Sequence, residues 1–210
     1  MSVIPLIVVQ VRGGLKEVDR MPDMRPNNLV WGYHGTSDRY VHEHLSHGIP
    51  RSTFPGDWLG HGCYFWEGDL ERARQWSERH VIPRHGGKPA ILAAVIDLTD
   101  CLDLTRTEGR ELVAAIAQSV YDELPPERHA ALRQNYYRRE MDCKVIEFIL
   151  ASTRKPDGSP RFSTVRGAFQ EGSPVYILPG GLISQVGDLD HIQINVTDPR
   201  AIIALDRVNL

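Results

Sequence analysis

Two short phrases of the sequence combine chemically useful side chains with glycine. Residues 33–36 read Tyr-His-Gly-Thr, and residues 59–66 read Leu-Gly-His-Gly-Cys-Tyr-Phe-Trp. A ring nitrogen of His34 can bond a hydroxyl group, and a glycine lets a ligand approach the main chain closely. Small residues beside a histidine and an aromatic ring such as Tyr64 favour a pocket over a packed core. These phrases therefore define the first candidate site.

Each phrase also has a purely structural interpretation. A single histidine at a strand end is often a satisfied structural residue, and consecutive aromatic residues often belong to a core. Alternation along a strand allows only one face of the triplet Tyr64-Phe65-Trp66 to be core. The sequence alone keeps both interpretations open for each phrase.

Histidines and cysteines elsewhere suggest metal or thiol chemistry, but their spacing is wrong. On a helix only residues three or four apart share a face, so His44 and His47 can act together and His42 cannot. No Cys-x-x-Cys or His-Glu-x-x-His pattern accompanies them, and we expect no metal site. The scattered cysteines fit neither a catalytic dyad nor a disulfide scaffold, which favours a reducing compartment. They are Cys63, Cys101 and Cys143.

Short strands and helices must position these groups. Apolar runs predict strands that carry His34 and Tyr64. Ser37 or Asp38 can cap the helix between these strands, and Asp69 can cap the helix that follows. The predicted strands cover residues 4–11, 29–34, 63–66, 90–96, 164–170, 175–178, 191–197 and 201–205.

The middle of the chain has a different character. Thr105-x-x-Glu108 matches a capping box, and apolar residues follow it at helical spacing. We therefore predict a helical insertion over about residues 105–153 in an otherwise strand-rich chain. Residues 1–210 are expected to form a single α+β domain.

Composition narrows the class of protein. Hydrophobic residues make up 41% and charged residues 24% of the chain, which is ordinary for a soluble globular protein. A formal net charge of -3 gives no footprint for non-specific nucleic-acid binding. The apolar start, Ile4 to Val11, lacks a basic leader and is too short to span a bilayer. We expect a cytoplasmic protein without membrane contact.

The two phrases, in this order and with a helix between them, resemble the ADP-ribosyltransferase superfamily. The resemblance is to the branch of diphtheria toxin and the poly(ADP-ribose) polymerases, with its His-Gly strand, Gly-x-Tyr-Phe strand and third residue on a later strand. The chain is more closely similar to uncharacterised bacterial members with a late His-Ile-Gln-Ile strand, here residues 191–194. The motifs cover residues 31–77 and 163–203, and the helical segment has no counterpart in the minimal fold. The resemblance implies a mostly antiparallel split β-sandwich with an NAD cleft.

The resemblance also implies roles for individual residues. His34 would bond an NAD ribose, Gly35 would hold the nicotinamide carboxamide through its backbone, and Tyr64 would stack on the nicotinamide ring. The family's second stacking aromatic corresponds to Gln75, and Trp76, one residue later, is either its replacement or a core residue. Two motif neighbours complete the NAD-binding set, namely Thr36 and Gly62.

The third family position departs from the polymerases. Gln193 stands where they have a glutamate, and a glutamine can orient a ribose but supplies no charge and no base. Loss of nicotinamide passes through an oxocarbenium-like state that a carboxylate stabilises. Glu171, before a Gly-Ser-Pro turn, is either that carboxylate or an ordinary turn residue, and Asp142 is a weaker candidate.

The resemblance implies an NAD-dependent mono-ADP-ribosyltransferase, with NAD as co-substrate and a protein or nucleic acid as acceptor. Family members of this kind include toxins, so a neutralising partner protein is a possible companion. Two alternatives stay open: an NAD glycohydrolase, and a non-catalytic module that binds NAD or ADP-ribose. A third, removal of a 2'-phosphate from RNA, requires a cluster of arginines, for which the candidates are Arg39, Arg51 and Arg166.

Overall fold

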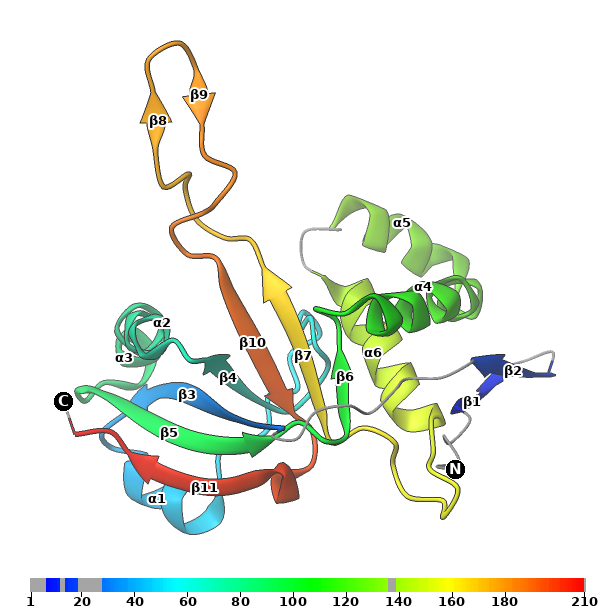
Figure 1. The fold of residues 1–210 in the computed structure, drawn as a ribbon, viewed down its shortest axis with the longest axis horizontal. Helices are drawn as coiled ribbons and strands as arrows, with labels where there is room; N and C mark the ends of the chain where they lie inside the picture. Colours follow the sequence, from blue (N-terminus) through cyan, green and yellow to red (C-terminus); the bar gives the residue numbers. More distant parts are fainter. Residues whose placement is uncertain (1–6, 12–13, 19–27, 136–138, 210) are drawn as a thin grey trace.

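A seven-stranded sheet forms the centre of the computed structural model, which describes residues 7–11, 14–18, 28–135 and 139–209 (Figure 1). The strand order is β11-β5-β3-β4-β10-β7-β6, and all neighbours are antiparallel except β6 and β7. The strands are Leu29–Ser37 (β3), Cys63–Glu67 (β4), Pro89–Asp97 (β5), Cys101–Asp103 (β6), Thr164–Phe169 (β7), His191–Val196 (β10) and Ile202–Arg207 (β11).

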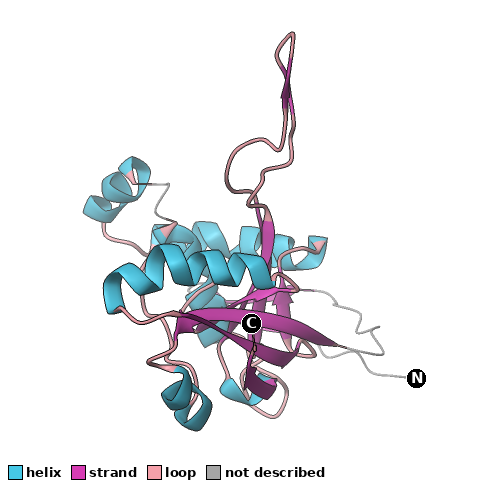
Figure 2. Ribbon diagram, turned by 90° about the vertical axis from the view of Figure 1, so that its left-hand side faces the viewer, coloured by secondary structure: helices cyan, strands magenta, loops and turns pink. Residues whose placement is uncertain are grey.

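Helices cover both faces of this sheet (Figure 2), and two small hairpins lie outside it (Figure 1). The helices are Val41–His47 (α1), Leu70–Trp76 (α2), the π-helical turn Ser77–Val81 (η1), Ile82–His85 (α3), Thr107–Asp122 (α4), Pro126–Gln134 (α5), Glu140–Ser152 (α6) and the 3-10 turn Pro199–Ala201 (η3). The hairpins pair Ile7–Val11 (β1) with Gly14–Val18 (β2), and Ile177–Leu178 (β8) with Leu182–Ile183 (β9).

The sheet has two faces, which we call the α1 face and the α2 face after the helices that cover them. On the α1 face, Phe65 and Ile194 are fully buried in a core that includes Val41 of α1. On the α2 face, Trp66 packs against Ala73 of α2. Successive residues of a strand point to opposite faces, so each strand contributes to both cores.

Register extends this division across β10 and β7. Gln193 of β10 is paired with Trp66 on one side and with Gly167 on the other, so all three belong to the α2 face. Asn195 is likewise paired with Tyr64. The predicted alternation, with His191, Gln193 and Asn195 on one face of a strand, is confirmed.

Helices α4 and α6 cover the end of the α2 face near Tyr64. Buried residues one turn apart, Leu112 and Ile116 on α4 and Ile146 and Ile149 on α6, form one core with Leu59. Full burial of such a side chain contributes about 1.5–3 kcal/mol. The predicted helical segment therefore contains three helices, two of which are packed firmly onto the sheet.

Strands β3 and β4 separate soon after they meet. Their ladder joins Gly32 to Glu67 and Tyr33 to Trp66, whereas β3 pairs with β5 at nine positions. Hydrogen bonds thus connect all seven strands into one sheet. The short β3–β4 ladder is the weak line in that sheet.

Between β7 and β10 the chain forms a projecting arm, which we define as residues 172–187. In Figures 1 and 2 this arm, with β8 and β9 near its tip, stands away from the body of the molecule. The predicted strand over 175–178 falls in the arm and is shorter than expected.

The predicted α+β class and mostly antiparallel sheet are confirmed, but two predicted caps are wrong. Helix α1 begins at Val41, because Ser37 Oγ donates to the Gly86 carbonyl at 2.8 Å and Asp38 accepts from the Lys88 N–H. The side chain of Asp69 caps α2 as predicted. Helix α4 begins at Thr107 instead of following a Thr105 cap, because Thr105 Oγ1 donates to Asp103. Of the predicted first strand, residues 4–6 lie outside the described residues.

None of the helices in the described part of the chain has the length and apolar character needed to cross a membrane.

Candidate functional site

The ring of His34 lies on the α1 face. It contacts the rings of His44 and Phe65, with centroids 6.0 and 5.8 Å apart, and Nδ1 donates to the Tyr64 carbonyl at 2.9 Å. A carbonyl oxygen only accepts, so Nδ1 carries the proton. Burial lowers the pKa of His34 to about 4, and the ring is therefore neutral at pH 7. His34 holds β3 to β4 where their ladder has ended.

Gly35 allows α2 to lie against β3. A Cβ at this position would come within 2.1 Å of the Ala73 carbonyl oxygen, so no other residue fits without a shift of the helix. Just after β3, the Asp38 N–H donates to the main-chain carbonyl of Lys88, which lies opposite it just before β5. In an antiparallel ladder the main-chain groups alternate in direction, so those of Gly35 point toward β4.

The side chain of Thr36 is buried on the α1 face beside His44. Its main-chain carbonyl accepts a hydrogen bond of 2.6 Å from Ser77 Oγ. Both contacts fix the end of β3 between α1 and the turn after α2.

Tyr64 lies on the α2 face, but its hydroxyl group is already used. It donates to the Gly60 carbonyl at 2.8 Å and accepts from the Leu59 N–H at 3.0 Å. Burial raises the pKa of Tyr64 well above its usual range, so it stays a neutral donor. The amide nitrogen of Asn195 also donates to the Leu59 and Gly60 carbonyls. A Cβ at Gly62 would lie 2.1 Å from Asn195 Oδ1, so this glycine permits the close approach of loop and strand.

The same loop is fixed on its other side by α6. His61 lies between Cys143 and Glu147, with Nε2 3.6 Å from Cys143 Sγ and Nδ1 3.5 Å from Glu147 Oε2. Cys143 is buried, and burial together with nearby carboxylates raises the pKa of its thiol to about 11. A protonated, buried thiol is a poor nucleophile. This trio therefore anchors the loop and does not activate the thiol.

Gln193 occupies the middle of the α2 face with Trp66 directly across the ladder. Both side chains are buried, and neither Gln193 Oε1 nor Trp66 Nε1 has a hydrogen-bond partner among the residues that the structure describes. The large majority of buried side-chain polar atoms in proteins have a hydrogen-bond partner. Unpaired neighbours of this kind indicate a place where a polar ligand or water completes the bonding.

Three further unpaired atoms lie on the same face. Of the six buried side-chain polar atoms without a partner in the described residues, five belong to the α2 face. They are Trp66 Nε1, Arg72 Nε, His191 Nε2, Gln193 Oε1 and Asn195 Oδ1. Because His191 Nδ1 lies 2.7 Å from the Leu189 carbonyl, Nδ1 carries a proton and Nε2 is an acceptor in the neutral ring. The set thus offers two N–H donors and three acceptors.

Glu171 reaches this group through Arg72. Arg72 Nη2 donates to Glu171 Oε2 at 2.7 Å, and the same oxygen lies 3.7 Å from His191 Nδ1. The Arg72 side chain is buried, whereas that of Glu171 is 40% exposed. The site therefore holds a fixed positive charge and a carboxylate that solvent and an incoming group can reach.

Two tryptophans flank the unpaired atoms. The ring of Trp76 lies 5.5 Å from that of Trp66 and 4.2 Å from that of His80. Trp76 is 40% exposed, whereas the neighbouring Ser77 is fully buried, so Trp76 is not a core residue. Trp76 is thereby free to present an aromatic surface to a planar ligand.

The structure thus brings together some of the predicted residues and separates others. Gln193, Tyr64 and Trp76 lie on the α2 face, and Glu171 is joined to it by Arg72. The side chains of His34 and Thr36 lie on the opposite face.

Trp66, Arg72 and His191 belong to this candidate site but were not predicted from the sequence. Trp66 and His191 belong to the quoted motifs, and alternation puts His191 beside Gln193, so a signal existed for them. Arg72 had no signal, because its place depends on how α2 lies against the sheet.

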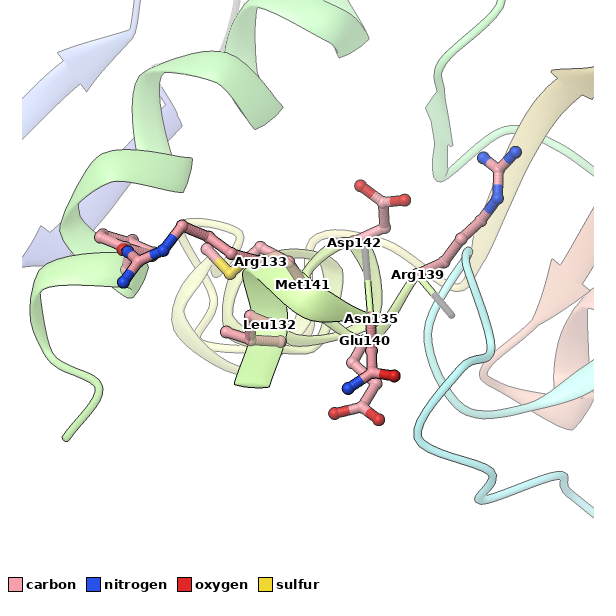
Figure 3. Close-up of a pocket in the computed structure, with 8 residues that line it drawn as sticks. Leu132, Arg133, Asn135, Arg139, Glu140, Met141 and Asp142 are labelled. Carbon is pink, nitrogen blue, oxygen red and sulfur yellow. The ribbon is translucent and has the colours of Figure 1, made fainter. Parts of the chain in front are cut away.

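Two cavities in the described part of the chain lie away from the α2 face. One, of about 660 Å³, lies among the helices, and Figure 3 shows Arg139, Glu140 and Asp142 at its wall. Burial raises the pKa of Asp142. The second, of about 420 Å³, is lined by residues such as Asp100 and Lys155.

The arginines considered for RNA chemistry do not gather. Arg39 donates to the His85 carbonyl, Arg51 to the Thr197 and His61 carbonyls, and Arg166 to Glu67. Among the residues that the structure describes, no group of three or more histidine, cysteine or acidic side chains is arranged to hold a metal ion.

Comparison of the chain with protein-family models, with curated proteins and with solved structures found no significant match. The α2 face is therefore the basis for a functional proposal.

Proposed function

We propose that the α2 face binds NAD and that the chain is a mono-ADP-ribosyltransferase acting on a macromolecular acceptor. The observation that supports this is the set of unpaired buried atoms around Gln193, beside an exposed tryptophan and a reachable carboxylate. Ribose hydroxyls both donate and accept, and they match a site that offers both N–H donors and acceptors. A planar nicotinamide or adenine ring suits the face of Trp76.

Each residue has a role in this proposal. Gln193 Oε1 and His191 Nε2 accept hydrogen bonds from ribose hydroxyls, and Trp66 Nε1 donates to a ribose or carboxamide oxygen. The Arg72 guanidinium, whose Nε–H is unpaired, attracts the pyrophosphate. Holding the ribose in this way supplies orientation before reaction.

Glu171 carries the chemistry. The bond between ribose C1' and the nicotinamide nitrogen breaks, and its electron pair leaves with nicotinamide. Positive charge then develops on the ribose, and a carboxylate stabilises it. The acceptor nucleophile bonds to C1' and transfers its proton to Glu171, whose side chain is 40% exposed. Arg72 holds Glu171 in place at 2.7 Å.

His34 contributes from the opposite face. Its hydrogen bond to the Tyr64 carbonyl fixes β4, which carries Trp66, against β3. In this proposal His34 is a positioning residue, and Gly35 offers its main-chain groups toward β4. Tyr64 fixes the Leu59–Gly60 loop through its hydroxyl group.

Calorimetric titration with NAD tests the binding step. We expect binding by the wild-type chain, a loss of affinity of roughly tenfold or more in Gln193→Ala, and no change in Thr164→Val. Thr164 is a matched control, because its buried Oγ1 also lacks a hydrogen-bond partner among the described residues. The residue itself is paired with Val196 in the strand ladder and therefore lies on the α1 face. Absence of NAD binding by the wild-type chain would overturn the proposal.

Labelled NAD tests the chemical step. After incubation with cell extract, label that protease releases identifies a protein acceptor, and label that nuclease releases identifies a nucleic acid. Glu171→Gln should bind NAD yet lose transfer by about 10²–10³-fold. Free ADP-ribose as the sole product would replace transferase with glycohydrolase, and binding without turnover would leave a non-catalytic NAD-binding module.

A further inference from the structure

The arm, residues 172–187, carries an unusual surface for a solvated hairpin. Seven large apolar side chains along it and at its tip are between 50% and 69% exposed. They are Val175, Tyr176, Ile177, Leu178, Leu182, Ile183 and Val186. Contiguous apolar surface of this kind marks an interaction site in a soluble protein.

The arm is nevertheless a formed hairpin. The Val175 N–H donates to the Val186 carbonyl at 3.0 Å, the Ser184 N–H donates to the Tyr176 carbonyl at 3.0 Å, and β8 pairs with β9 at the tip. At its base the Gly187 N–H donates to Asp190, and the Asp188 N–H donates to the Ser173 carbonyl at 2.8 Å. An isolated two-stranded hairpin is marginally stable in water, so this arm gains most from a partner that covers it.

We propose that the arm is the interface of a homodimer, in which the arms of two copies pair about a two-fold axis. Residues 172–187 contain no charged side chain. A two-fold axis brings identical surfaces together, so any charge near it would meet its own like charge. A wholly uncharged arm is suited to self-association and offers nothing to a charged partner such as nucleic acid.

The exposed area also agrees with a dimer. Seven side chains that are half to two-thirds exposed present on the order of 700 Å² per chain, close to the ~800 Å² that each partner contributes to a standard interface. The strands β8 and β9 belong to a separate two-stranded sheet, so both of its edges lack a strand neighbour among the described residues. An edge of one copy can therefore extend the hairpin of the other by antiparallel strand addition.

Sedimentation equilibrium of the full chain tests this proposal. We expect the wild-type mass to approach twice 23.7 kDa as concentration rises. Ile177→Asp and Ile183→Asp should each weaken the dimer by ~30-fold or more, because they place a charge in the apolar contact. Ile203→Asp is the matched control, since Ile203 is also exposed but lies on β11, far from the arm in Figure 1.

A second measurement needs no variant. Amide hydrogen exchange in residues 175–186 should slow as protein concentration rises, while exchange in β11 stays constant. A wild-type chain that remains monomeric at about 100 µM would overturn the proposal, as would a dimer that the arm substitutions leave intact. A monomer that binds neutral phosphatidylcholine vesicles through the arm would also overturn it, in favour of a lipid surface.

Discussion

The two faces of the seven-stranded sheet differ in how their buried polar groups are paired. On the α1 face, Arg166 donates through two nitrogens to the two carboxylate oxygens of Glu67 and also reaches Asp103, and Cys63 Sγ donates to the Ile49 carbonyl. On the α2 face, five buried polar atoms have no partner among the described residues, against one, Thr164 Oγ1, on the α1 face. An unpaired buried polar atom costs about 1–3 kcal/mol of stability. One face of the same strands is therefore built for stability, and the other retains unused capacity for hydrogen bonding.

The largest effect on stability is expected for Arg166→Met. It removes the guanidinium that is paired with the partly buried carboxylates of Glu67 and Asp103, which costs about 3–5 kcal/mol. Urea unfolding measures this loss, and NAD affinity of the folded fraction should not change. Weaker NAD binding at unchanged stability would break the distinction between the two faces.

A pH effect comes next, from His34. Its pKa is about 4 in the folded chain and 6.5 in a model peptide, so the unfolded state binds more protons between these values. Stability should therefore be fully present above pH 6.5 and fall as pH drops toward 4, by up to about 3 kcal/mol from this group. When urea unfolding is measured at several pH values in this range, the free energy of unfolding of His34→Gln should depend less steeply on pH than that of the wild type. An unchanged dependence on pH would show that His34 is not buried in its neutral form.

The α2 face provides the matching arginine experiment. Arg72→Met should weaken NAD binding roughly tenfold or more, while costing stability only about 1 kcal/mol, because Glu171 remains 40% exposed to water. Calorimetry and urea unfolding of the same sample separate the two effects. A stability loss as large as that of Arg166→Met would place both arginines in one structural class.

A smaller effect on NAD affinity than that of Arg72→Met is expected for Tyr64→Phe. The Leu59 N–H loses its acceptor and the Gly60 carbonyl loses one of its donors, which costs about 1–2 kcal/mol. The ring itself is retained, so NAD affinity should stay within about twofold of the wild type. A marked loss of affinity would instead give the Tyr64 hydroxyl a direct role in ligand binding.

Sequence patterns predicted the strands well where polar and apolar residues alternate. Alternation along residues 191–197 correctly separated Gln193 from Ile194, because successive side chains of a strand point to opposite faces of the sheet. The same patterns missed β6, which has three residues and is too short for a period. The capping box at Thr105 failed because Asp103 competed for the same hydroxyl group.

The composition of the site was less predictable. Sequence motifs predicted Gln193, Glu171 and Trp76 as residues of the candidate site, and they also grouped His34 with Tyr64. Whether the side chains of His34 and Tyr64 lie on the same face of the sheet depends on the register of β3 with β4. In that register Tyr33 is paired with Trp66. Register is a property of two strands together, so neither motif contains it. Residues 175–178 likewise predicted a strand without indicating that it would leave the main sheet.

The brief contact between β3 and β4 has a mechanical consequence. On one side of this contact lies a first group of strands, β11, β5 and β3, and on the other side lies a second group, β4, β10, β7 and β6. Two residue pairs, the hydrogen bond from the Gly68 N–H to the Trp31 carbonyl and the His34 hydrogen bond join these two groups of strands. Local unfolding begins where the fewest contacts hold a structure together. The hydrogen bonds between β3 and β4 should therefore break before the ladders within either group of strands. Trp66 and Gln193, which belong to the proposed NAD site, would then move together with the second group of strands.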